Sequence, residues 1–402
     1  MATVVAVGTL DTKRAEYAYL CERLRAHGVD VVLVDAGVIG EPAPEADVAR
    51  EDVAREAGTT VANLVAQGDR GVAVAAMSRG AAEVVKRLHA DGRLDGIVGL
   101  GGTGGTSLVT HAMRQLPVGV PKLIVSTVAS GDTRPYVGAV DITMMYSVVD
   151  VAGVNQISAR IIGNAAAAIA GMAQAPMPEI EARPLLAASM FGVTTACVTI
   201  ARERLEELGY EVLVFHQTGT GGESMEELVR AGFIVGVLDA TTTELCDELV
   251  GGVFAAHPER VEVAGAAGVP QVVSLGALDM VNFGALDTVP ERFRDRRLHV
   301  HNPNVTLMRT SPEECAELGR RLATKLNAAT GPTALFIPLG GISMIATPGE
   351  PFHDAEADEA LFGSLREHLA DGVEAHELEL DINDPQFALA MANRLHEMLE
   401  AR

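Results

Sequence analysis

The sequence predicts an α/β protein of two Rossmann-like, doubly wound lobes with mainly parallel sheets and a cleft between them. Short apolar, β-branched runs alternate with segments of helix length, as expected of parallel sheets covered by helices on both faces. A proline-rich stretch at 173–184, AQAPMPEIEARP, interrupts that alternation once. Glycine and threonine gather where the predicted strands end, which is where such folds bind ligands.

The first predicted lobe spans 1–174 and precedes a linker at 175–184. Its strands and helix-length segments alternate in the order Thr3–Val7, Arg14–His27, Val31–Val34, Glu45–Gln67, Gly71–Ala90, Gly96–Leu100, Thr106–Leu116 and Lys122–Ser126. The alanine-rich stretch Ser147–Met172 is predicted to form one long helix.

The second predicted lobe spans 185–402 and repeats the alternation. Its segments are Leu185–Met190, Thr194–Leu208, Glu211–His216, Met225–Ala231, Phe233–Leu238, Thr243–Val250, Gln271–Leu275, Pro312–Ala329, Ala334–Pro338, Ala355–Leu369, Ala375–Leu380 and Pro385–Leu399. The starts of the two lobes resemble each other, either through internal duplication or because all βαβ units share such a pattern.

Composition excludes several classes of function. The 402 residues contain 31 Lys and Arg against 54 Asp and Glu, a formal charge of −23, which speaks against a nucleic-acid-binding surface. Hydrophobic residues make up 48% of the chain, too many for general disorder. The sequence shows no signal peptide or membrane span and only four scattered cysteines, so we expect a cytoplasmic protein. A basic run at 292–297 is either a solvated face or an anion-recognition loop.

Two loops of the first lobe are candidate phosphate sites. In GTLDTK at 8–13, Thr9 is placed to cap the next helix, Asp11 to bind a metal ion or ribose, and Lys13 to reach a phosphate. The second loop follows a strand and opens a helix, so its backbone N–H groups suit an anion. The residues predicted to hold phosphates there are Gly101, Gly102, Thr103, Gly104, Gly105 and Thr106.

This second loop matches neither standard nucleotide motif. Gly99, Gly101 and Gly104 satisfy GxGxxG, but Lys122 stands where dinucleotide-binding enzymes carry an acidic ribose ligand. A Walker A loop would need lysine before Thr106, and Gly105 is there instead. Tight helix–sheet packing is the alternative reading of the glycines.

Further candidates follow later strands. Arg134 is a phosphate or carboxylate clamp, and Asp132 is either a Mg²⁺ ligand or the partner of Arg134 in a turn. The predicted substrate-binding residues of the second lobe are His216, Thr218, Gly219, Thr220, Gly221, Gly222, Thr241, Thr242 and Arg309. For acid–base chemistry the candidates are His301, Asp279 and Asn282.

Eight blocks in order along the chain resemble the UPF0261 family, also called Tm-1-like ATP-binding domain proteins. They are GTLDTK at 8–13, GLGGTGGTSL at 99–108, STVASGDTRPYVG at 126–138, FHQTGTGG at 215–222, LDATTTEL at 238–245, GALDMVNFG at 276–284, HNPNVTLMRT at 301–310 and INDPQFA at 382–388. The resemblance implies two Rossmann-like subdomains, Mg²⁺-dependent ATP binding and a homodimer. Placing ATP on the first two loops is our inference from their backbone chemistry.

Three functions are therefore open. The first is an Mg-ATP-binding protein that uses ATP on a small anionic metabolite. The second is a hydrolase, lyase or isomerase that uses no ATP and acts on a carboxylate or sugar acid in the cleft between the lobes. The third is a non-catalytic binding protein. The sequence alone names no substrate.

Overall fold

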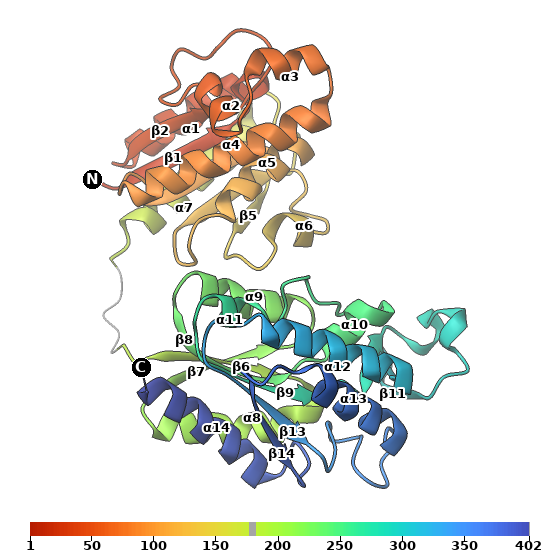
Figure 1. Ribbon diagram of the computed structural model, residues 1–402. Helices are drawn as coiled ribbons and strands as arrows, with labels where there is room; N and C mark the ends of the chain where they lie inside the picture. Colours follow the sequence, from red (N-terminus) through yellow and green to blue (C-terminus); the bar gives the residue numbers. More distant parts are fainter. Residues whose placement is uncertain (177–181, 402) are drawn as a thin grey trace. The chain divides into compact units, whose positions relative to one another are not determined.

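The computed structural model describes residues 1–176 and 182–401. The chain divides into two compact units, Met1–Glu179 and Ile180–Arg402, here called the N-terminal and C-terminal lobes. Residues 177–181 of the predicted linker lie outside the described residues. Both lobes contain parallel sheets flanked by helices, which confirms the predicted α/β class (Figure 1).

The N-terminal lobe is built on one five-stranded parallel sheet in the order β2-β1-β3-β4-β5. Its strands are β1 (Thr3–Gly8), β2 (Asp30–Asp35), β3 (Gly96–Gly101), β4 (Lys122–Ser126) and β5 (Thr143–Tyr146). Its helices are α1 (Leu10–Ala26), α2 (Arg50–Glu56), α3 (Val61–Gln67), α4 (Arg70–Ala90), α5 (Thr103–Met113), α6 (Arg134–Val137) and α7 (Gln156–Gln174).

Successive residues of β1 serve two separate cores, because side chains alternate between the faces of a strand. Val5 and Val7 pack with α4 and α5, whereas Val4 and Ala6 pack with α1 and α7. The sheet is thus covered on both faces, which explains why its strands read as continuous apolar runs.

The C-terminal lobe has a six-stranded parallel sheet in the order β14-β13-β9-β8-β6-β7. Its strands are β6 (Leu185–Met190), β7 (Glu211–His216), β8 (Ile234–Thr241), β9 (Gln271–Gly276), β13 (Thr333–Pro338) and β14 (Glu374–Leu378). Its helices are η1 (Gly192–Thr194), α8 (Thr195–Glu207), α9 (Thr220–Arg230), α10 (Glu244–Val250), α11 (Val263–Ala266), η2 (Leu286–Thr288), η3 (Glu291–Phe293), α12 (Pro312–Asn327), α13 (Ala355–His368) and α14 (Pro385–Glu400).

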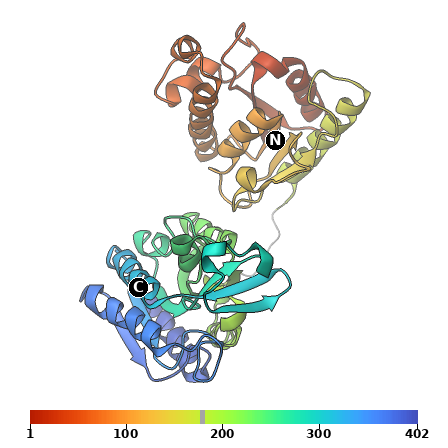
Figure 2. The ribbon, with the colours of Figure 1, turned by 90° about the vertical axis from the view of Figure 1, so that its right-hand side faces the viewer.

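A small antiparallel sheet is inserted between β9 and β13. Its strands, in the order β10-β12-β11, are β10 (Met280–Phe283), β12 (Val305–Arg309) and β11 (Leu298–Asn302). Figure 2 shows these strands in teal. None of these three strands was predicted from the sequence.

The predicted helix Ser147–Met172 was wrong in its first third. Helix α7 begins only at Gln156, where Asn155 accepts hydrogen bonds from the N–H groups of Ile157 and Ser158 in a capping box. Before it, Val148 has φ 62°, a left-handed conformation that no helix of L-residues contains. No helix within the described residues has both the length and the apolar character needed to cross a bilayer.

Candidate functional site

The strand order of the N-terminal sheet creates a ligand crevice at the carboxyl ends of β1 and β3. The chain crosses from β1 to β2 on one side and reaches β3 on the other, and ligands of open α/β sheets bind at such a reversal. The two predicted phosphate loops follow these two strands. Tyr17 of α1 joins the strands, since its buried hydroxyl donates to Val7 O (2.6 Å) and accepts from Leu100 N–H (2.8 Å).

A cavity of about 1550 Å³ opens at this crevice, within the N-terminal lobe. Its lining comes from the loops after β1, β2 and β3, from the start of α1 and from helices α3 to α6. Among the lining residues are Thr9, Asp11, Lys13, Val38, Ile39, Leu64, Val65, Arg70, Met77, Arg79, Gly102, Thr103, Gly104, Gly105, Ser107, His111, Arg114 and Tyr136. The volume exceeds the 300–1000 Å³ typical of small-molecule sites, so it has room for more than one ligand.

The N-terminus of α5 supplies backbone donors to the cavity. Gly102 occupies the N-cap position without a capping side chain, and the first helical bond runs from Thr106 N–H to Gly102 O (2.8 Å). The N–H groups of Thr103, Gly104 and Gly105 therefore have no acceptor among the described residues. Three free N–H groups and the positive end of the helix dipole form an anion cradle.

Packing explains two glycines of the GxGxxG stretch but not those that line the cavity: a Cβ on Gly99, within β3, would lie 2.5 Å from Val109 Cγ1. A Cβ on Gly101 would lie 2.7 Å from Thr106 N, so that position needs glycine. A Cβ on Gly104 would meet nothing closer than Arg70 Nη2 at 3.7 Å, and one on Gly102 nothing closer than 3.8 Å. Because neither residue has a positive φ, the fold tolerates side chains there, and their absence keeps the cradle open.

Cations without carboxylate partners surround the cavity. Arg70 and Arg79 of α4 and Arg114 at the end of α5 form no salt bridge within the described part of the chain. The pKa of His111 is lowered, first by burial and then by the charges of Arg114 and Arg79. Lys13 also lines the cavity, but its ammonium donates to the Val151 carbonyl. The cavity is thus cationic in a protein of charge −23.

Asp11 is the carboxylate that faces this cavity from α1. Its Oδ2 accepts the N–H groups of Val38 (2.9 Å) and Ile39 (3.1 Å) in the loop after β2. Its Oδ1 is buried and has no hydrogen-bond partner among the described residues. One free carboxylate oxygen beside phosphates is sufficient for Mg²⁺, which binds through one or two carboxylates, phosphate oxygens and water. The described residues contain no cluster of three or more His, Cys, Asp or Glu side chains suited to a metal ion.

The other first-lobe candidates lie away from the cavity lining. Thr106 is fully buried and its hydroxyl bonds to that of Ser126 (2.7 Å) beneath the loop. Asp132 is exposed and accepts the backbone N–H of Arg134 (3.1 Å), as in a turn. Gly101 and Arg134 are not among the residues that line the cavity. Tyr136 of α6, two residues after Arg134, does line it.

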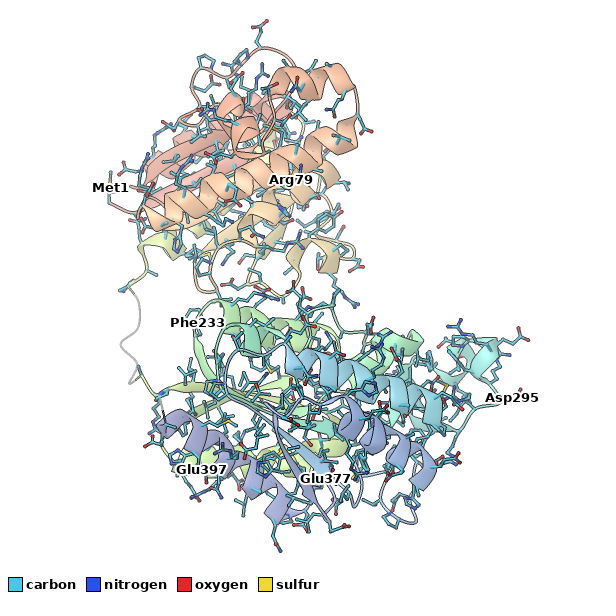
Figure 3. All side chains as sticks on the ribbon, viewed as in Figure 1. Met1, Arg79, Phe233, Asp295, Glu377 and Glu397 are labelled. Atoms are coloured by element: carbon cyan, nitrogen blue, oxygen red, sulfur yellow. The ribbon has the colours of Figure 1, made fainter. Side chains whose placement is uncertain are left out.

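Sequence reasoning missed the cavity's arginines and His111. They lie within helices or at helix ends, where a cation is normally a solvated surface residue. Arg79 was the best available signal, as a lone cation in the small-residue stretch AAMSRGAA. Figure 3 labels Arg79 on α4.

In the C-terminal lobe the glycine-rich loop is already occupied by a side chain of the same lobe. Glu244 Oε1 accepts the N–H groups of Gly219 (2.6 Å) and Gly222 (3.2 Å), where an external anion was expected. Arg260 holds the other oxygen of Glu244 (2.8 Å) and also Asp239 (2.7 Å). All three charged side chains are at most 2% exposed.

The remaining substrate-binding candidates of this lobe are also engaged. Thr241 bonds to Thr194 (2.7 Å), and Thr242 donates to Ser274 O (3.1 Å). His216 is exposed and stacks on Phe191 with ring centroids 5.3 Å apart. The flanking residues of the loop, Thr218, Thr220 and Gly221, complete the turn into α9; a Cβ on Gly221 would strike His216 O.

No hydrogen bond among the described residues joins the three acid–base candidates. Asp279 is fully buried, accepts from Ser343 (2.8 Å), and has a pKa raised to about 6 by burial. Asn282 is fully buried and pairs with Asp247, whose pKa burial raises to about 7. His301 is exposed on β11.

Arg309 and the basic run have internal partners. Arg309 is buried and bonds to Asp358 (2.6 Å) and to Phe352 O (2.8 Å). In the basic run, Arg296 bonds to Glu314 (2.7 Å), and Arg297 lies 3.4 Å from Asp354. Structural ion pairs thus account for three of the cations proposed for anion recognition.

Known proteins match the chain over its whole length. Residues 2–178 match the family model "Uncharacterised protein family (UPF0261) N-terminal domain", and residues 183–399 match the corresponding C-terminal domain. A UPF0261 protein of Clostridium tetani is 51% identical over 99% of both chains, and one of Rhizobium meliloti 48% identical over 97% of both.

A plant relative is longer than this chain. The ToMV resistance protein Tm-1(GCR237) of Solanum lycopersicum is 39% identical over 98% of this chain but only 55% of its own length. Among solved structures, the glycosyltransferase SsfS6 of Streptomyces sp. SF2575 covers the whole chain at 14% identity with a TM-score of 0.23, which supports no argument about fold or function.

Proposed function

The chain belongs to the UPF0261 family, and from that premise we propose that its N-terminal lobe binds Mg-ATP and uses it on a small anionic metabolite. The observation that carries the proposal is the cradle on α5. Its N–H groups have no acceptor among the described residues, Gly102 and Gly104 are not needed for packing, and it opens into a cavity beside Arg70.

The cavity offers chemically suitable residues for each part of Mg-ATP: the phosphates, the base and the metal ion. The N–H groups of Thr103, Gly104 and Gly105, with Arg70 beside them, suit the phosphates. Apolar side chains suit the base, and the lining offers Val38, Ile39, Leu64, Val65 and Met77. Asp11 would hold Mg²⁺ through its unpartnered oxygen, and the ion would supply positive charge to the phosphates.

Isothermal titration calorimetry with Mg-ATP tests this proposal. We expect binding by the native protein and at least a 100-fold loss in Gly104→Arg, whose side chain would fill the cradle. The matched control is Gly163→Arg on α7, where a Cβ has open space and which is not among the lining residues. Equal affinity in all three proteins would contradict the site.

The second candidate function is an enzyme that uses no ATP and converts a carboxylate or sugar acid. It is favoured by the arginines of the cavity, because a guanidinium pairs with a carboxylate as well as with a phosphate. A thermal-shift screen separates the two, since ligands raise the melting temperature according to their affinity. A carboxylate that stabilises the protein when Mg-ATP does not would support the second candidate.

A further inference from the structure

We propose that the cavity contains a second anion subsite, formed by Arg79 of α4, His111 of α5 and Arg114 directly after α5. It would bind the phosphate or carboxylate group of a small molecule held beside the nucleotide. The identity of the first ligand rests on the proposed function, whereas the subsite itself needs only the residues that form it.

The subsite is too far from the cradle to share one anionic group with it. Helices α4 and α5 pack against each other and both start at the carboxyl edge of the sheet (Figure 1). Arg79 is nine residues beyond Arg70, or about 13 Å along α4. His111 is eight residues beyond Thr103, or about 12 Å along α5. The two groups of donors therefore lie at opposite ends of the same cavity wall.

Unbalanced charge indicates that an anion belongs between these side chains. Arg79 and Arg114 both contribute to lowering the pKa of His111, so their charges act on one region. Within the described residues neither arginine has a carboxylate partner. Arg87, farther along α4, is by contrast paired with Glu56. A bound anion would therefore be attracted by two guanidinium groups at once without competing with a carboxylate of the described residues.

The surroundings define the class of ligand. Within the part of the chain that the structure describes, Arg114 makes one weak side-chain contact, from Nη1 to Pro135 O at 3.5 Å, and its other guanidinium nitrogens have no acceptor there. Tyr136 of α6 and Ser107 of α5 line the same cavity and offer hydroxyl groups. Two guanidinium forks with neutral donors suit planar or tetrahedral groups with several anionic oxygens. The subsite is therefore expected to take a phosphate ester or a di- or tricarboxylate.

Calorimetry with inorganic phosphate and with citrate tests the subsite, using protein saturated with Mg-ATP. We expect at least one probe to bind, and the variant carrying Arg79→Gln and Arg114→Gln to bind it at least 10-fold more weakly with unchanged affinity for Mg-ATP. The matched control is Arg87→Gln, on the same helix but not in the cavity lining. The tighter of the two probes identifies the ligand as phosphate or carboxylate.

NMR of His111 makes the test site-specific. Binding of the probe should shift the imidazole signals of His111 and raise its pKa, because the anion offsets the charges of Arg79 and Arg114. Failure of both probes to bind the native protein, or equal binding by the double variant, overturns the inference.

Failure of the proposed function gives a different result. If Mg-ATP does not bind, the same titrations are made on the free protein. A probe that binds to Gly104→Arg but not to the double variant would uphold the subsite and refute the nucleotide site.

Discussion

The two lobes share one strand order but use the carboxyl edge of their sheets differently. Counted from the start of each lobe, the order is 2-1-3-4-5 in both, and the C-terminal sheet adds a sixth strand. Both carry glycine- and threonine-rich loops at that edge. In the N-terminal lobe such a loop opens into a cavity, whereas in the C-terminal lobe Glu244 occupies the N–H groups and Arg260 neutralises it.

The difference shows that a glycine-rich loop specifies donors but not what they bind. Gly104 leaves space that no residue fills, while a Cβ on Gly222 would lie 2.1 Å from Glu244 Oε2. One glycine serves an external ligand and the other makes room for an internal carboxylate. We therefore expect substitutions to reduce binding in one lobe and stability in the other.

The largest effect is expected from Arg260→Met. It would leave Asp239 and Glu244 buried without their cation, and breaking such a buried network costs about 3–5 kcal/mol. The comparison variant Arg79→Met removes an exposed, unpaired cation and should change stability by less than about 0.5 kcal/mol. Urea unfolding, with hydrogen exchange to resolve the lobes, measures both. Similar stability losses in the two variants would contradict the contrast between the lobes.

The matched pair Gly222→Ala and Gly104→Ala compares the two loops directly. Gly222→Ala forces a methyl group into Glu244 and Arg260 and should destabilise the C-terminal lobe by up to about 3 kcal/mol. Gly104→Ala has space for its methyl group, so the free energy of unfolding should hardly change while affinity for Mg-ATP falls several-fold. Chemical denaturation gives the free energy of unfolding of each variant, and calorimetry gives its affinity for Mg-ATP. A loss of stability in Gly104→Ala would show that the fold itself needs glycine at position 104.

The sequence could not predict that one glycine-rich loop is open and the other is occupied by Glu244, because that difference depends on tertiary contacts. Strand and helix patterns are local, and most of the predicted segments correspond to observed ones, such as Pro312–Ala329 to α12. Whether a loop is free depends on a residue distant in sequence: Glu244 stands 25 positions after Gly219. In the same way, the free state of Arg79 and the pairing of Arg309 with Asp358 are set by tertiary neighbours that no spacing rule identifies.

The stability of the C-terminal lobe should also depend on pH through Asp279, a buried carboxyl group that follows β9 at the carboxyl edge of the sheet. Its pKa rises from 3.8 to about 6 in the fold, so its contribution to stability is fully present below pH 3.8 and is lost as pH rises through 6. Such a rise in the pKa of a buried carboxyl group corresponds to roughly 3 kcal/mol in the free energy of unfolding. Asp279→Asn should be about 1–2 kcal/mol more stable than the native protein at pH 8 and about 1–2 kcal/mol less stable at pH 4. The removed carboxylate contributes only at the higher pH, whereas the new amide N–H without an acceptor costs the same at both.

Unfolding of native protein and Asp279→Asn at the two pH values checks this sign. A variant that is less stable than the native protein at pH 8 would contradict the expected sign and mean that the ionised carboxylate of Asp279 stabilises the fold, through Arg309 and Ser343.

The smallest effect concerns the threonines of the first-lobe loop, which the sequence alone cannot rank. Thr106 is buried and bonds to Ser126, so Thr106→Val should cost the N-terminal lobe about 1 kcal/mol and leave affinity for Mg-ATP unchanged. Thr103 is exposed and lines the cavity, so Thr103→Val should leave stability unchanged and weaken binding by a few-fold. Both variants make the same chemical change, replacing a hydroxyl group by a methyl group. Differences between them in melting temperature and in affinity for Mg-ATP therefore reflect only where each threonine lies. Reduced Mg-ATP affinity in Thr106→Val at unchanged stability would place that hydroxyl on the ligand and mean that the loop rearranges on binding.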